Sequence, residues 1–155
     1  MNLFFKKKSG FTLLELMLVM SILVIIALAS REVYNGFALG KNIDNISKTI
    51  VFDLRGARSN AMNGQEDSNW GVHFVNSTSD YYEIFTSPTV YGAFSSSVRT
   101  TVYLGSGISF SLPSEGNNQD IIFAKLSGTS TTANINIIST SNQKTISVNS
   151  EGLVN

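Results

Sequence analysis

The most distinctive pattern of the chain is a long apolar run near its start. Residues 11–29 read FTLLELMLVMSILVIIALA, and Glu15 is the one charged residue among these nineteen. As an α-helix, this run would rise roughly 28 Å, about the thickness of the hydrocarbon core of a bilayer. Three lysines precede the run and one arginine follows it closely. The pattern therefore predicts a membrane-spanning helix with a cytoplasmic N-terminus.

Beyond residue 30 the helical pattern continues with a different polarity. The chain has two prolines, Pro88 and Pro113, so proline interrupts nothing before residue 88. Apolar residues recur at steps of three and four, which predicts a helix with one buried face. They are Ile43, Ile46, Ile50, Leu54, Ala57 and Ala61. The other face carries Asp44, Lys48, Asp53, Arg55 and Arg58, which we expect to be solvated. Asn63-Gly64 supplies a stop signal near Met62.

After residue 65 the pattern changes to short runs in which apolar and polar residues alternate. Such runs, separated by Gly, Ser, Asn and Pro, predict about seven antiparallel strands, in one sheet or in two small ones. They lie near residues 70–74, 82–86, 98–104, 108–112, 121–124, 135–138 and 145–148. We expect the apolar face of this sheet to bury the helical stripe 43–61. The predicted fold class is α+β, with one long N-terminal helix packed on an antiparallel β-sheet.

Composition excludes several classes of function. The chain has 155 residues, no cysteine and one histidine, His73, which excludes disulfides and thiolate metal sites and leaves little for a catalytic triad. It has 11 basic and 11 acidic residues, and without its first ten residues the net charge is −3. A mildly acidic body is not expected to bind nucleic acid, which requires clustered Lys and Arg. We expect no enzyme activity, no cofactor and no metal.

Glu15 distinguishes this apolar run from an ordinary anchor or secretory signal peptide. Ala27-Leu28-Ala29 is similar to a signal-peptidase site, so a cleaved signal peptide is the alternative. A carboxylate in a membrane span costs a few kcal/mol and is usually functional. If the chain were cut after Gly10, Phe11 would carry a new amine one helical turn from Glu15. The two groups could then neutralise each other, within one chain or between neighbouring subunits.

The residues around this position resemble a known signature. Lys6-Lys7-Lys8-Ser9-Gly10 followed by Phe11-Thr12-Leu13-Leu14-Glu15 is similar to the prepilin signature of type IV pilins and type II secretion pseudopilins. The resemblance implies a pilin fold and cleavage of the Gly10–Phe11 bond by a membrane prepilin peptidase. The same enzyme would methylate the amine of Phe11, and Glu15 would be the assembly carboxylate.

The resemblance divides the chain into four predicted parts. Residues 1–10 would be the leader peptide and 11–30 the transmembrane and filament-core helix. Residues 31–62 would be an amphipathic stalk helix, and 65–155 a β-rich periplasmic head. The chain would be a single-pass protein of the bacterial inner membrane that is extracted into a filament on assembly. Its partners would be other pseudopilins or pilins, the prepilin peptidase/methyltransferase, an inner-membrane assembly platform and membrane lipid.

Looser matches favour one branch of this family. Residues 53–61 and 144–154 resemble the end of the stalk helix and the closing strand pair of the GspH/FimT group of minor pseudopilins and minor pilins. Major pilins usually have a stalk proline and a disulfide-closed loop, whereas here Glu32 stands near the proline position and cysteine is absent. We therefore expect a minor pseudopilin of a type II secretion system. The alternatives are a FimT-like minor pilin, active in pilus assembly or DNA uptake, and an anchored periplasmic enzyme, for which no nucleophile–base pair is present.

Two other places in the sequence are weaker candidates for a binding site. Residues 114–120, SEGNNQD, offer oxygen ligands for calcium, but their spacing fits no calcium motif and predicts a solvated turn. His73 has no carboxylate at a characteristic spacing, and we expect it to be a structural or surface residue.

Overall fold

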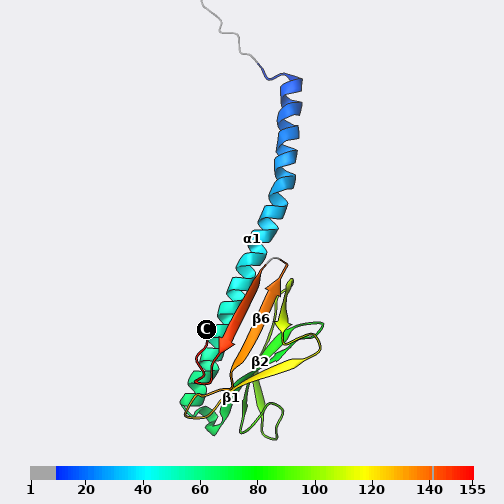
Figure 1. The fold of residues 1–155 in the computed structure, drawn as a ribbon. Helices are drawn as coiled ribbons and strands as arrows, with labels where there is room; N and C mark the ends of the chain where they lie inside the picture. Colours follow the sequence, from blue (N-terminus) through cyan, green and yellow to red (C-terminus); the bar gives the residue numbers. More distant parts are fainter. Residues whose placement is uncertain (1–9, 141) are drawn as a thin grey trace, which may run out of the picture. The chain divides into compact units, whose positions relative to one another are not determined.

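The structure is a computed structural model that describes the backbone of residues 10–140 and 142–155, and the side chains of these residues apart from 30–40. It has the predicted α+β architecture, an N-terminal helix followed by antiparallel sheets (Figure 1). The chain divides into two compact units, Met1–Phe37 and Ala38–Asn155. Each unit is described by itself.

The helix α1 runs over Leu13–Met62, fifty residues without a break. It begins two residues later than the apolar run because Thr12 caps it: the Glu15 backbone N–H donates to Thr12 Oγ1 over 3.2 Å. It ends as the Asn63-Gly64 signal predicted, since Gly64 takes a left-handed conformation with φ 63°. A short 3₁₀ turn, η1, follows over Gln65–Asp67.

Seven strands follow, and they form two antiparallel sheets, the second of the two arrangements that the sequence allowed. The first sheet has the order β3-β2-β1-β5 and the second the order β4-β6-β7. Their bounds are β1 Asn69–Val75, β2 Tyr81–Ser87, β3 Ser97–Tyr103, β4 Ile108–Leu112, β5 Asn118–Phe123, β6 Ala133–Ser139 and β7 Gln143–Val148. A bridge between Val148 and Val154 returns the C-terminal residues beside β7.

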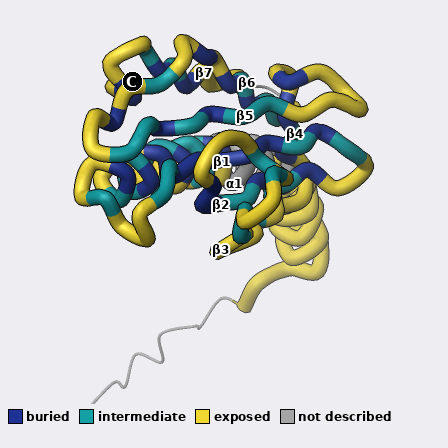
Figure 2. Tube along the Cα trace, turned by 90° about the horizontal axis from the view of Figure 1, so that it is seen from below, coloured by how far each residue is buried: buried dark blue, intermediate teal, exposed yellow. Residues whose placement is uncertain are grey.

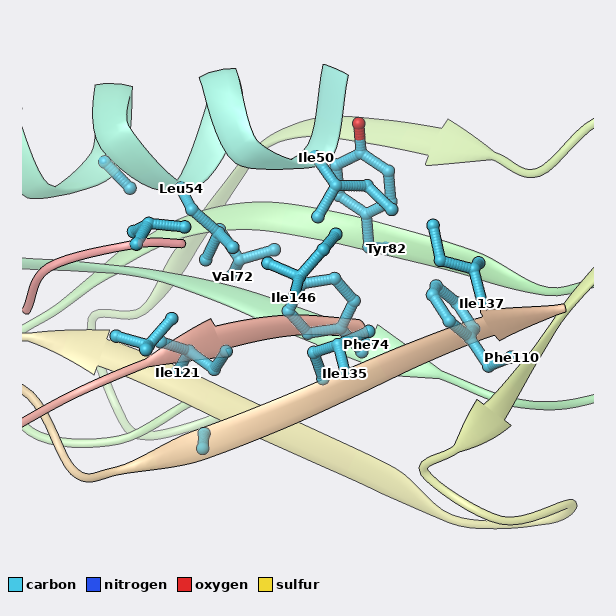
Figure 3. Close-up of a cluster of buried hydrophobic side chains, with 14 of the residues drawn as sticks. Ile50, Leu54, Val72, Phe74, Tyr82, Phe110, Ile121, Ile135, Ile137 and Ile146 are labelled. Atoms are coloured by element: carbon cyan, nitrogen blue, oxygen red, sulfur yellow. The ribbon is translucent and has the colours of Figure 1, made fainter. Parts of the chain in front are cut away.

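The core lies between the helix and the inner faces of both sheets (Figure 3). The predicted helical stripe is confirmed: five of its six residues are buried, and Ile46 packs against them half-exposed. Strand side chains alternate between the two faces of a sheet, so Val72 and Phe74 of β1 point inward while His73 points to the other face. The buried sheet residues include Trp70, Val72, Phe74, Tyr82, Phe110, Ile121, Phe123, Ile135, Ile137, Ile146 and Val148.

Two buried polar side chains form hydrogen bonds that connect the two sheets. The Asn76 amide donates to the carbonyls of Phe110 and Pro113 over 2.9 and 2.7 Å. The Asp80 carboxylate accepts the backbone N–H groups of Ser77 and Phe110 over 2.9 and 2.6 Å. Buried polar groups are tolerated when they are hydrogen-bonded in this way, and here the bonds fix the β1–β2 turn against β4.

Candidate functional site: the start of the long helix

The proposed cleavage bond lies in an exposed segment that precedes the helix. Residues 10–12 have no regular structure, and the Phe11 side chain is 81% exposed. A Cβ added at Gly10 would meet no atom within 4 Å, and no left-handed backbone calls for glycine there. The fold itself therefore does not require glycine at position 10. A requirement for glycine at this position would come from a partner such as a peptidase.

Glu15 occupies the first turn of α1, close to Phe11. Its carboxylate is exposed, and among the described residues it forms no ion pair. The sequence Thr12-Leu13-Leu14-Glu15 fits the pattern of a capping box, in which a Thr at the N-cap precedes a Glu three residues later. This local role was missed in the sequence analysis, although the spacing alone could have indicated it. A negative charge here is also favoured by the dipole of the helix.

The first part of α1 exposes nearly all of its apolar side chains (Figure 2). Such a continuous apolar surface needs a lipid or protein environment to cover it. The one hydroxyl in the middle of the run is satisfied locally, because Ser21 donates to the carbonyl of Met17 over 2.7 Å. Over the part of the chain that is described, no helix reaches both the length and the apolar character needed to cross a membrane. Residues 1–9, which make up most of the predicted leader and contain its three lysines, and the side chains of Arg31 and Glu32 lie outside what is described.

His73 has a carboxylate partner that sequence spacing did not reveal. Its Nδ1 lies 2.5 Å from Asp120 Oδ1, and its ring stacks on Tyr91 with centroids 3.7 Å apart. The partner was missed because it is 47 positions away and comes close only when β5 pairs with β1. In the sheet register His73 lies between Glu83 on β2 and Asp120 on β5. These three residues form a polar row on the outer face of the four-stranded sheet.

Tyr91 holds the β2–β3 loop down onto this row. Its hydroxyl donates to Glu83, and its ring packs edge-on against Phe85 at 5.0 Å. Burial, and then the hydrogen bond to Glu83, raise the pKa of Tyr91 to about 12. Thr101 on β3 also donates to Glu83, over 2.9 Å. The polar side chains of this row are thus bonded to one another, to Tyr91 and to Thr101. Together they hold the β2–β3 loop against the sheet.

Three residues expected on the solvated helix face instead bind the head. Arg55 donates to the carbonyl of Val154 over 2.9 Å, and Arg58 donates to the carbonyls of Gly128 and Glu151 over 3.3 and 3.1 Å. Asp53 accepts a 2.6 Å hydrogen bond from the buried Tyr82 hydroxyl. Arg55 stays exposed as predicted, although its guanidinium is bonded, whereas the side chains of Asp53 and Arg58 are partly buried. The two arginines find these carbonyls because the C-terminal residues fold back beside the helix, and Asp53 finds its partner on β2. The two arginines also line a groove of about 590 Å³ with Met62 and Leu153.

The segment 114–120 is only partly the turn that the sequence predicted. Its last three residues, Asn118 to Asp120, are the first residues of β5, and Asp120 is engaged with His73. The turn itself is closed by a hydrogen bond from the Asn117 N–H to the Ser114 carbonyl, 3.0 Å long. Within the described residues, no group of three or more His, Asp or Glu side chains is placed to hold a metal ion.

Comparison with known proteins adds one match, and it falls on the start of the chain. Residues 5–30 match a family model described as the prokaryotic N-terminal methylation motif. No curated protein and no solved structure matches the chain. The motif belongs to structural subunits, and its prepilin-like leader implies processing by a prepilin peptidase and assembly with other pilins. Together with a helix that precedes antiparallel sheets, as in the pilin fold, this match supports placing the chain in the class of type IV pilin-like and pseudopilin subunits.

Proposed function

We propose that this chain is a minor pseudopilin, a structural subunit of a type II secretion pseudopilus that supports protein export. The observation that carries the proposal is the methylation motif at residues 5–30. This motif overlaps the start of a helix whose first turn contains Glu15. Residues 11–30 would anchor the chain in the inner membrane and later lie in the filament core. The stalk helix 31–62 and the head 65–155 would stand on the periplasmic side.

Processing would prepare the N-terminus for assembly. Cleavage between Gly10 and Phe11 would convert an amide into an amine, which the same peptidase would methylate. The exposed, non-helical segment at residues 10–12 supports access to this bond. The new amine would lie one turn from Glu15, whose carboxylate has no cation of its own in the described chain.

Assembly would use this charge pair between subunits. A carboxylate that enters a low-dielectric filament core is costly unless a cation compensates it. The Phe11 amine of a neighbouring subunit would provide that cation and set the register of the incoming helix. The exposed apolar side chains of residues 13–28 would bury against the same neighbours.

The runner-up is a FimT-like minor pilin of a type IV pilus. It shares the leader and the fold, and a role in DNA uptake would require basic residues near the C-terminus. The cation nearest that end is Lys144, which is paired with Asp44 at 3.0 Å. This ion pair favours the secretion role over direct DNA binding.

Crosslinking in the native membrane, followed by mass spectrometry of the captured neighbours, tests the proposal. The expected neighbours are secretion pseudopilins and their assembly platform. Pilus subunits together with a retraction motor would instead identify a minor pilin of a type IV pilus. Neighbours from neither machine would refute both roles.

A further inference from the structure

Three connections between strands of the head come together and enclose a polar hollow. They are the β1–β2 turn, the segment between β3 and β4, and the turn that precedes β5. The hollow has a volume of about 380 Å³, which is within the usual range for small-ligand sites. We call it the loop hollow, and the lining residues that matter here are Thr78, Asp80, Tyr103, Ser106, Ser109 and Glu115.

Hydrogen bonds between these connections fix the shape of the loop hollow. The Leu104 N–H donates to the carbonyl of Asp80 over 2.9 Å, which joins the end of β3 to the residue before β2. The Asn76 N–H donates to the Asn117 carbonyl and the Gly116 N–H donates to the Asn76 carbonyl, each over 3.0 Å. Because the fold already holds these walls, a ligand does not have to order them, which lowers the cost of binding.

A buried carboxylate lines the hollow in a fixed orientation. Asp80 is 8% exposed, and its two oxygens accept the backbone N–H groups of Ser77 and Phe110 over 2.9 and 2.6 Å. Each oxygen of a carboxylate has two lone pairs, so each keeps one acceptor position after these bonds are made. The two N–H groups therefore orient the carboxylate without using all of its capacity to accept.

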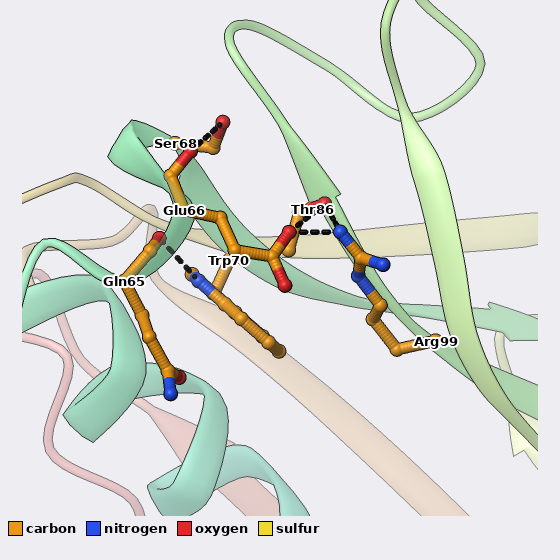
Figure 4. Close-up of polar contacts among 6 residues, drawn as sticks. All are labelled: Gln65, Glu66, Ser68, Trp70, Thr86 and Arg99. Carbon is orange, nitrogen blue, oxygen red and sulfur yellow. Dashed lines mark hydrogen bonds and ion pairs between the residues drawn. The ribbon is translucent and has the colours of Figure 1, made fainter.

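The carboxylates of the hollow lack the counter-charge that other carboxylates of the head have. Figure 4 shows a compensated one, the Glu66 carboxylate, which meets Arg99 and Thr86. Among the described residues, neither Asp80 nor Glu115 forms an ion pair, and no Lys, Arg or His lines the loop hollow. The hollow is therefore rich in acceptors and repels anions.

Hydroxyl groups occupy much of the remaining lining. Those of Thr78, Ser106 and Ser109 form no hydrogen bond with any described residue. A hydroxyl group both donates and accepts, so these side chains pair well with a ligand that carries hydroxyls of its own. An apolar ligand would instead leave the hydroxyls and carboxylates unpaired, at a cost in free energy.

An exposed aromatic ring also belongs to the loop hollow. Tyr103 is 66% exposed, although its ring packs against that of Tyr81 with the centroids 5.5 Å apart. The contact with Tyr81 holds the ring in place, and the exposed part of the ring adds a flat apolar surface to a polar hollow. The C–H groups of a pyranose ring form an apolar face that packs well on the negative face of an aromatic ring.

We propose that the loop hollow binds a neutral oligosaccharide, with one pyranose ring packed on Tyr103 and its hydroxyls bonded to Asp80 and Glu115. A sugar has hydroxyl donors around its edge and an apolar ring face, so it matches both kinds of surface at once. A metal ion fits less well, because no three His, Asp or Glu side chains of the described chain converge to hold one, and it would not use the aromatic ring. This inference is independent of the proposed function, since assembly through the N-terminal helix does not use this surface.

Saturation-transfer NMR of the full chain tests this proposal. The chain is purified in dodecyl-dimethylamine oxide, a detergent without a sugar headgroup, and is titrated with maltotetraose and, separately, with chitotetraose. These two neutral oligosaccharides differ in the configuration of their linkages and in their substituents. We expect transfer of saturation from the protein to the ring protons of at least one of them.

Substitutions at exposed positions show whether binding uses the loop hollow. Tyr103→Ala should weaken binding at least about tenfold, whereas Tyr103→Trp, which keeps an aromatic surface, should retain it. Phe94→Ala is the matched control: it removes a 99% exposed ring outside the hollow and should leave binding unchanged. Glu115→Gln keeps an acceptor oxygen but removes the charge, so it should also retain sugar binding. Trp70 fluorescence checks that each variant is folded.

The opposite results would overturn the inference. It fails if neither oligosaccharide receives saturation, if Tyr103→Ala binds as well as the natural chain, or if Phe94→Ala weakens binding as much as Tyr103→Ala does. Calcium chloride is titrated in a parallel sample. Binding of calcium that Glu115→Gln abolishes, together with no binding of either sugar, would identify the hollow as a cation site instead.

Discussion

The packing of α1 on the sheets predicts very different effects for two neighbouring substitutions. Leu54 is fully buried and points from the helix toward Val72 (Figure 3), whereas Phe52, two positions earlier, is 75% exposed. We compare Leu54→Ala with Phe52→Ala. The two changes remove apolar atoms from one helix, and only the first removes them from the core.

The expected magnitudes follow from burial. Truncating a buried leucine to alanine costs about 2–5 kcal/mol, and the cost rises when the surroundings cannot collapse into the cavity. Leu54 is enclosed between a helix and two sheets, so we expect about 3 kcal/mol or more. Typical domains have only about 5–15 kcal/mol of stability, which makes this a severe loss. Phe52→Ala should stay within about 0.5 kcal/mol of the natural chain, since exposed substitutions rarely cost more.

Urea unfolding of the full chain in mild detergent measures both effects. Trp70 is the sole tryptophan of the sequence and is 7% exposed in β1, so its fluorescence reports on the sheet that the helix covers. We expect the midpoint of Leu54→Ala to fall far below that of Phe52→Ala. A cost of less than about 1 kcal/mol for Leu54→Ala, or an equal loss of stability in the two variants, would refute the packing of Leu54 in the core.

Three further predictions address the site and the head. Glu15→Ala should leave membrane insertion intact but deplete the chain from sheared filaments, as quantified by immunoblot, and Glu15→Gln is the isosteric control. Normal recovery of Glu15→Ala in the filaments would count against the charge pair. Arg58→Ala should expose the C-terminal residues to proteolysis and cost about 1–2 kcal/mol, because the carbonyls of Gly128 and Glu151 lose a charged donor. Arg58→Lys should restore part of this protection, and equal cleavage of all three chains would show that Arg58 does not hold the C-terminal residues in place. The pKa of Tyr91, raised from 10.0 to about 12, stabilises the fold below pH 10, and this contribution is lost as the pH rises toward 12. In urea titrations across that range, Tyr91→Phe should lose stability with pH less steeply than the natural chain, and an identical slope would refute this role of the Tyr91 hydroxyl.

The sequence predicted well those features that depend on local periodicity. The helical stripe and the number of strands follow from patterns of two or 3.6 residues, and the stop at Gly64 follows from the local Asn63-Gly64 signal. The methylation motif is also local, and the family match at residues 5–30 supports the class that it indicated.

What the sequence did not predict are contacts between residues far apart in the chain. Arg58 and Glu151 are 93 positions apart, and His73 and Asp120 are 47 apart. The His73–Asp120 contact depends on which strands pair, and the Arg58–Glu151 contact depends on where the C-terminal residues return. Neither contact produces a periodic pattern in the sequence. The capping box at Thr12 is different, since it is local and its spacing could have been recognised. The roles of Gly10, Phe11 and Glu15 stay predictions.

The most direct test of the central claim is the mass of the mature N-terminus. The full chain and its Gly10→Val variant are purified from membranes, and their N-terminal peptides are sequenced by mass spectrometry. The account predicts that the natural chain begins at Phe11 with one methyl group on its amine, and that Gly10→Val retains residues 1–10. A chain that begins elsewhere, an unmethylated Phe11, or a normally processed Gly10→Val variant would contradict it.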